Sequence, residues 1–201
     1  MASTTTALLV IDVQNDFCEG GALAVPDGSA VVALINTMMA DADTVILTQD
    51  WHPAGHSSFA TQHPGKAPLE VIKLPYGDQV LWPDHCVQGT TGADFHPGLD
   101  VARARAVIRK GMRPGVDSYS AFFENDRATP TGLEGYLRSL GVTRLTLAGL
   151  ALDFCVGYSA LDAARLGFEV EVITGACRAI DAGGSLAGAQ QAMAAAGVVL
   201  R

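Results

Sequence analysis

The residues with the clearest capacity for chemistry lie in two short segments, 49–53 and 82–86. Asp50 and His52 follow an apolar run, and residues two apart in an extended strand project from the same face. Their side chains can therefore converge on one point, where His85 could complete a three-ligand set. Three protein ligands with open positions are typical of a catalytic metal, because a structural site closes all four. The two imidazoles favour zinc, iron or manganese over calcium or magnesium.

Three further residues each follow an apolar run that predicts a strand: Asp12, Lys110 and Cys155. A carboxylate, an ammonium and a thiol at one edge of a sheet could form a nucleophilic site, in which the carboxylate takes the thiol proton. Asp153 is a plausible helix N-cap, which places Cys155 in a first helical turn that would stabilise a thiolate. Each residue also has a simpler interpretation, as a turn partner, a solvated lysine or a buried structural thiol.

The elements that must position these residues alternate between strands and helices. The strands are predicted at 7–13, 45–49, 106–109, 144–148, 169–173 and 198–200, and the helices at 29–42, 131–140, 153–166 and 185–196. The strand segments are near-continuous apolar runs, as expected for strands covered on both faces. The sequence therefore predicts an α/β fold with three layers, in which a doubly wound, mostly parallel six-stranded sheet carries helices on both faces.

One segment, about 51–98, departs from this alternation. It is rich in Pro, Gly and His, and it begins at a strand end, where α/β folds place their ligand crevice. We predict a single domain over residues 1–201 with this segment as a lid. His56, His63 and His96 are predicted to be surface or loop histidines. The sequence lacks a GxGxxG motif and a Walker loop, so a dinucleotide or phosphate-cradling site has no signature here.

Composition limits the classes of partner. The chain has 201 residues, of which 49% are hydrophobic and 17% charged, and its formal net charge is −8. This balance predicts a globular protein and argues against nucleic acid and anionic membranes as partners. The N-terminus lacks a signal peptide, so we predict a cytosolic location, in which the four cysteines are thiols.

Five motifs in this order resemble one family over nearly the whole chain. Segment 11–17 resembles its aspartate motif, 48–53 and 82–87 its metal motifs, 109–111 its lysine motif and 149–156 its nucleophile motif. The family is that of the nicotinamidases, also called pyrazinamidases, within the isochorismatase-like cysteine hydrolases.

The resemblance implies a metal-dependent cysteine amidohydrolase. It would convert nicotinamide to nicotinate and ammonia in NAD salvage through a covalent thioester, and would also accept pyrazinamide. It implies a catalytic triad of Asp12, Lys110 and Cys155, and one divalent transition metal, zinc foremost with iron or manganese as alternatives. The metal ligands would be Asp50, His52 and His85.

The resemblance also implies how the substrate is held. In the family the pyridine nitrogen is thought to reach the metal. The ring-binding residues implied are Phe17, Leu23, Trp82 and Tyr119. The backbone N–H groups of Ala151 and Cys155 would form the oxyanion hole, beside a cis peptide at Leu150–Ala151.

Two alternatives stay open at this point. One is another isochorismatase-like amidohydrolase acting on a carbamoyl or ureido substrate, which the metal motifs disfavour. The other is a non-catalytic ligand-binding relative, since fold alone does not fix function. His56 is assigned to the surroundings of the metal rather than to its ligands. The metal identity and the choice between monomer and homo-oligomer are also open.

Overall fold

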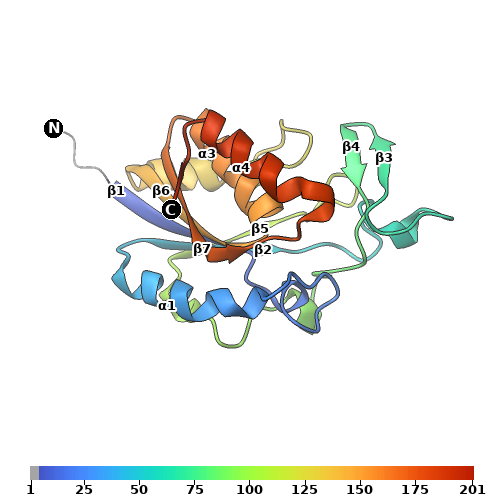
Figure 1. Cartoon of the computed structure of the whole chain (residues 1–201), viewed down its shortest axis with the longest axis horizontal. Coiled ribbons are helices and arrows are strands. Elements are labelled where there is room, and N and C mark those ends of the chain that lie inside the picture. The colour runs from blue at the N-terminus through green and yellow to red at the C-terminus, as the bar shows by residue number, and fades with distance from the viewer. Residues whose placement is uncertain (1–4) are drawn as a thin grey trace.

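The structure is a computed structural model that describes residues 5–201, and its centre is a six-stranded parallel sheet (Figure 1). The strand order is β5-β2-β1-β6-β7-β8, and every neighbouring pair is parallel. The strands are β1 (Thr5–Ile11), β2 (Val45–Asp50), β5 (Ala106–Lys110), β6 (Val142–Leu150), β7 (Glu169–Arg178) and β8 (Val199–Leu200). The chain adds strands on one side of β1 (β2, then β5) and then continues on its other side with β6. α/β sheets form ligand crevices at such a switch point.

Helices cover both faces of this sheet. Figure 1 shows α1 below the sheet and α3 and α4 above it. The helices are α1 (Val32–Asp41), α2 (Leu133–Ser139), α3 (Gly157–Arg165) and α4 (Ser185–Ala195). Short helical turns lie at Asn15–Phe17, Gly28–Val31, Ala60–Gln62, Thr91–Ala93, Val101–Arg103 and Ala182–Gly184, with a π-helical turn at Leu152–Val156. The predicted three-layer α/β class is confirmed.

Alternation along β1 divides the core into two layers. Leu9 and Ile11 pack with the cluster that contains the buried residues of α2, α3 and α4, whereas Leu8 and Val10 pack with the buried residues of α1. Successive strand residues point to opposite faces, so one continuous apolar run can serve both layers. The apolar character of β1 is therefore required on both sides of the sheet.

Several predicted boundaries were wrong by a few residues. β7 extends to Arg178, well beyond the predicted end at residue 173, because its pairing with β6 shifts register between Leu147 and Gly149 and then resumes. The helix predicted from residue 29 begins as a 3₁₀ turn, and α1 starts at Val32. Gly141 and Gly167 follow α2 and α3 with φ angles of 70° and 85°, as expected of helix C-termini.

The segment 51–98 contains an antiparallel hairpin that the sequence did not predict. Its strands are β3 (Val71–Leu74) and β4 (Gly77–Val80), and the hairpin stands away from the central sheet at the upper right of Figure 1. Two isolated β-bridges, Phe59–Trp82 and His52–Val87, join the first part of the segment to its later part. Among residues 5–201, none of the helices is long and apolar enough to span a bilayer.

Candidate active site

The carboxyl ends of four neighbouring strands bring one ammonium group against two carboxylates and a thiol. Lys110 closes β5, and its Nζ lies 2.9 Å from Asp12 Oδ2 and 3.0 Å from Asp50 Oδ1. The same ammonium donates to the carbonyl of Ser118 at 2.8 Å and lies 3.5 Å from Cys155 Sγ. All these groups are buried, so a charged lysine here is stabilised only by its partners.

Asp12 is held by the strand beside it. The residue has a φ of 47°, an uncommon angle that turns the chain out of β1. Thr48 of β2 donates its hydroxyl to Asp12 Oδ1 at 2.6 Å and accepts the Asp12 N–H at 3.1 Å. The second oxygen, Oδ2, is left to face Lys110. The carboxylate is therefore oriented by one strand and directed toward the Lys110 ammonium, which also lies 3.5 Å from Cys155 Sγ.

Burial sets the protonation states of this cluster. Burial raises the pKa of Asp12, and Lys110 only partly offsets that effect. Burial by itself would lower the pKa of Lys110, but the Asp12 and Asp50 carboxylates outweigh it and raise the pKa well above its usual value. Burial also raises the pKa of the Cys155 thiol well above its usual value, against the opposing effect of Lys110. The resting cluster thus holds an ammonium and a neutral thiol beside a carboxylate of raised pKa.

One prediction about the surroundings of Cys155 was wrong, and a second is opposed by burial. Asp153 does not cap the helix that follows β6; its carboxylate instead accepts hydrogen bonds from the backbone of Ile180 and Asp181 and from the Ser185 hydroxyl. Burial raises the pKa of the Cys155 thiol, as do the Asp12 and Asp50 carboxylates, and this opposes the predicted stabilisation of a thiolate. Cys155 lies in the π-helical turn before α3, and the peptide Leu150–Ala151 just before that turn is cis, as the resemblance predicts.

Asp50, His52 and His85 converge into a buried group with the donor set of a divalent metal site. His52 Nε2 lies 3.1 Å from Asp50 Oδ2, and His85 Nε2 lies 3.6 Å from the same oxygen. The Nδ1 atoms point the other way, 2.9 Å from the Gly111 carbonyl and 2.8 Å from the Pro83 carbonyl. Carbonyl acceptors at both Nδ1 atoms leave both Nε2 lone pairs facing the carboxylate, which is the arrangement of metal-ligating histidines.

Two supports of this group were not predicted. The buried amide of Gln14 forms two hydrogen bonds with the backbone of Asp50. Its Oε1 accepts the Asp50 N–H at 2.7 Å, and its Nε2 donates to the Asp50 carbonyl at 2.8 Å. Gly111 has a φ of 66°, and a Cβ at this position would lie 2.5 Å from the His52 ring. Gly111 thus leaves room for the imidazole as well as making the turn after Lys110.

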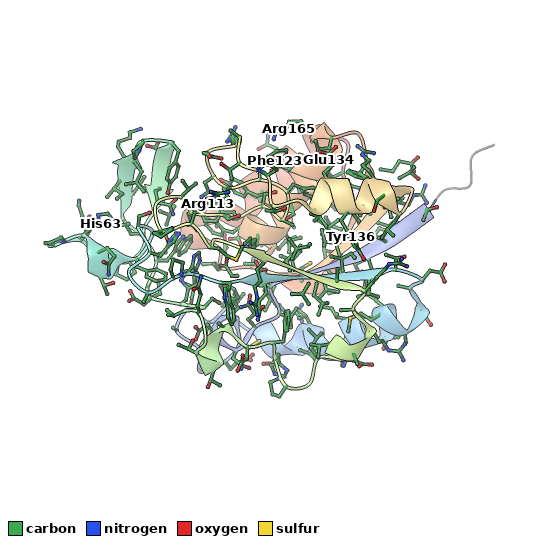
Figure 2. The ribbon with its side chains drawn as sticks, turned by 180° about the vertical axis from the view of Figure 1, so that it is seen from behind. His63, Arg113, Phe123, Glu134, Tyr136 and Arg165 are labelled. Atoms are coloured by element: carbon green, nitrogen blue, oxygen red, sulfur yellow. The ribbon has the colours of Figure 1, made fainter. Side chains whose placement is uncertain are left out.

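The other histidines separate into one buried and two peripheral side chains. His56 is fully buried, which corrects its prediction as a surface or loop histidine; its ring lies 4.4 Å from that of His52, and Nδ1 contacts Ser58 Oγ at 2.8 Å. His63 and His96 are partly exposed, and Figure 2 shows His63 near the outer end of segment 51–98. Asp117, His52 and His56 also form a buried group whose candidate ligand atoms lie within 4.8 Å of one another.

A narrow pocket opens beside Cys155 and the Asp–His group. The cavity volume is about 20 Å³, close to the space that one water molecule needs. All four residues assigned to ring binding line it together with Cys155, Asp50 and His85: Phe17, Leu23, Trp82 and Tyr119. Apolar and aromatic walls with a few polar groups are typical of a small-molecule site.

Three further lining residues were not predicted, namely Asp117, Phe154 and Ile180. The ring of Phe154 packs edge-on against Trp82, with centroids 5.0 Å apart. Phe154 is adjacent to Cys155 in the sequence, which was the only signal available for it. Asp117 and Ile180 come from loops whose placement depends on tertiary packing, so no local pattern indicated them.

A family model described as the isochorismatase domain matches residues 6–201. This chain belongs to the isochorismatase family. It is 52% identical to a nicotinamidase of Acinetobacter baylyi over 96% of this chain and 90% of that relative. Within the isochorismatase family, it therefore groups with the nicotinamidases.

Solved structures agree with this placement in the isochorismatase family. A nicotinamidase/pyrazinamidase of Acinetobacter baumannii is 50% identical, with a TM-score of 0.97 over 100% of this chain and 97% of that chain. A pyrazinamidase of Pyrococcus horikoshii in complex with zinc is 33% identical, with a TM-score of 0.79 over 98% of each chain.

Proposed function

We propose that this chain hydrolyses nicotinamide to nicotinate and ammonia, and pyrazinamide to its acid, through a covalent thioester. The observation that carries the proposal is the position of Lys110 Nζ, within 3.5 Å of Asp12, Asp50 and Cys155 beside an aromatic pocket. The identity of 52% with a nicotinamidase supports the choice of substrate. Asp12, Lys110 and Cys155 are proposed as the catalytic residues.

The first half-reaction starts from a neutral thiol. Asp12 accepts the Cys155 proton as sulfur attacks the carboxamide carbon, and its raised pKa suits it to hold that proton. The tetrahedral oxyanion would be bound by the backbone N–H groups of Ala151 and Cys155, and Lys110 offsets the local negative charge. Asp12 then passes the proton to the departing nitrogen. The C–N bond breaks, ammonia leaves and the acyl group remains on sulfur.

The second half-reaction removes the acyl group. Asp12, again a carboxylate, accepts a proton from an incoming water molecule. The oxygen of that water attacks the thioester carbon at the same time. The C–S bond breaks, the sulfur takes the proton back and nicotinate is released. One water is consumed, and one ammonia and one nicotinic acid are formed. The acid then gives its proton to ammonia or solvent and becomes nicotinate, so atoms and protons balance. The narrow pocket limits the number of waters that compete for this position.

Asp50, His52 and His85 are the residues proposed to hold one divalent metal ion. The fit rests on a buried carboxylate faced by two imidazole Nε2 atoms whose Nδ1 atoms contact carbonyls. Zinc is the first choice, supported by the zinc complex of the Pyrococcus horikoshii relative, with iron or manganese as alternatives. When bound, the ion supplies a Lewis-acidic anchor for the ring nitrogen beside the nucleophile.

Phe17, Leu23, Trp82 and Tyr119 are proposed to enclose the ring, and segment 51–98 is proposed to be a lid inserted in a single domain. The partner that we propose is the small-molecule substrate nicotinamide, and we expect neither nucleic acid nor a membrane to take part. A cytosolic location is also proposed, supported by the four cysteines, which are all free thiols.

Ammonia release from nicotinamide tests this function directly. The assay compares the protein as purified, the same protein after chelation, and the chelated protein after addition of zinc, iron or manganese separately. We expect turnover that is lost on chelation and restored by at least one metal. Turnover of ureido substrates with none of nicotinamide would instead assign the chain to a different amidohydrolase. Stoichiometric binding of nicotinamide without ammonia release would indicate a non-catalytic relative.

A further inference from the structure

The β3–β4 hairpin is exposed or half-exposed at every position except one, which is Gln79. The side chain of Gln79 is fully buried and points from the hairpin toward the pocket wall. A buried primary amide is costly unless its hydrogen bonds are made. Its partners therefore show what the hairpin is attached to.

Both ends of the Gln79 amide are used. Nε2 donates to Asp117 Oδ2 at 2.7 Å and lies 3.1 Å from the Tyr119 hydroxyl oxygen. Oε1 accepts hydrogen bonds from the Tyr76 hydroxyl at 2.9 Å and from Asn125 Nδ2 at 3.3 Å. One side chain of the hairpin thus connects its own turn with two residues that line the pocket.

The connection continues into the aromatic wall. Trp82 Nε1 donates to the Tyr119 hydroxyl at 3.2 Å, and the two rings pack edge-on with centroids 6.2 Å apart. Trp82, Tyr119 and Asp117 all line the pocket that contains Cys155, whereas Gln79 does not. Gln79 can therefore act on a bound ring only through these neighbours.

We propose that Gln79 is a positioning residue that fixes the aromatic wall for the substrate ring and couples the hairpin to substrate binding. The inference rests on the proposed function and names a determinant of ring recognition at that same site. A glutamine suits this position because its amide nitrogen can donate to the Asp117 carboxylate while its amide oxygen accepts from the Tyr76 hydroxyl. Glutamate would place a second carboxylate against Asp117, and methionine would keep the length but leave Asp117 Oδ2 without the Gln79 donor.

The test measures kcat and KM for nicotinamide in Gln79→Met and Gln79→Glu, with Lys73→Ala as the matched control. Lys73 lies on the same hairpin and pairs with Asp78 at the surface. We expect KM to rise about tenfold in both Gln79 variants with kcat within about threefold, since one charge-assisted hydrogen bond is lost. Lys73→Ala should match the wild type, and the bound metal should be unchanged in all variants.

A double-mutant cycle separates positioning from general loosening of the hairpin. If Gln79 acts partly through the Tyr119 hydroxyl, the KM effect of Gln79→Met should shrink in a Tyr119→Phe background. Equal effects in both backgrounds, an unchanged KM, or a loss confined to kcat would each overturn the inference.

Nicotinate titration followed by tryptophan fluorescence gives a readout that does not require turnover. We expect the Gln79 variants to bind nicotinate about tenfold more weakly than Lys73→Ala. If the wild type binds nicotinate and releases no ammonia, the proposed function fails and the titration still tests Gln79. If the wild type is active and the variants bind nicotinate normally, the inference about Gln79 fails alone.

Discussion

Two regions meet at the pocket and are built differently. The charged cluster of Asp12, Asp50 and Lys110 is attached to adjacent parallel strands, whose backbone ladders set its geometry. The aromatic wall of Trp82 and Tyr119 is attached to loops and is joined by side-chain hydrogen bonds. The difference suggests a division of roles, in which the sheet edge fixes the chemistry and the loops fix recognition. Changes in the cluster should lower kcat and stability, whereas changes in the wall should raise KM.

Lys110→Met should have the largest effect. It leaves two buried carboxylates facing each other without their shared cation, and breaking a buried ion pair costs about 3–5 kcal/mol of unfolding free energy. We expect kcat to fall about 10²- to 10³-fold as well, because the local charge is no longer offset. Denaturant unfolding and ammonia release measure the two effects. A variant with wild-type stability and kcat within tenfold would contradict the role given to the sheet edge.

Gly111→Ala should weaken the metal site selectively. The added Cβ would lie 2.5 Å from the His52 ring and would strain a backbone with φ of 66°. Displacing an imidazole that we propose as a metal ligand should weaken metal affinity by about 10- to 100-fold. Competition with a chromogenic chelator measures this change. Gly115→Ala, at a position with open space around it, is the control; equal affinities in both variants would refute the proposed crowding.

The pH dependence of Cys155 alkylation tests the state of the thiol. Because its pKa is raised above its usual value, the thiolate fraction at neutral pH is smaller than that of an ordinary thiol. We expect iodoacetamide to react about tenfold more slowly than with free cysteine at pH 7, with a rate that still rises above pH 9. Peptide mapping assigns the label to Cys155.

Asp12→Asn provides the matched comparison for that profile. The Asp12 carboxylate raises the pKa of Cys155, so its neutralisation should move the profile to lower pH while access to the sulfur is preserved. A wild-type rate that reaches its plateau below pH 7 would show a stabilised thiolate and would reverse the assigned order of proton transfer.

Trp82→Phe should have the smallest effect and should appear mainly in KM. The variant keeps an aromatic ring but loses the hydrogen bond to the Tyr119 hydroxyl. A neutral hydrogen bond contributes about 1 kcal/mol, which corresponds to roughly a fivefold rise in KM. Steady-state kinetics with nicotinamide and pyrazinamide measure it. A fall in kcat larger than the rise in KM would contradict the division between the two regions.

The sequence could predict the sheet edge because its signals are local. Apolar runs ending in Asp12, Asp50 and Lys110 indicated the strands and the side chains at their ends, and the i, i+2 spacing indicated that Asp50 and His52 converge. Parallel pairing then brings strand ends together without any need to know the loops. The strand register and the exact helix starts were less accessible, since a bulge in β6–β7 and a 3₁₀ turn before α1 depend on packing.

The features that the sequence did not predict depend on contacts between residues far apart in the chain. The β3–β4 hairpin has short strands with charged residues, so its pattern resembled a loop. The hydrogen bond between Gln14 and Asp50 spans 36 residues of sequence, and the one between Gln79 and Asp117 spans 38. Asp153 resembled an N-cap because its own position is suitable, but it binds a segment 27 or more residues away. No local pattern distinguishes such alternatives.

Trapping the acyl-enzyme tests the central claim most directly. The protein is mixed with nicotinamide, quenched in acid during turnover and analysed by intact mass and peptide mapping, with Cys155→Ala in parallel. The account predicts a nicotinoyl adduct on the Cys155 peptide that disappears as substrate is exhausted, and no adduct or ammonia from the variant. Continued ammonia release by Cys155→Ala, or an adduct confined to another cysteine, would contradict it.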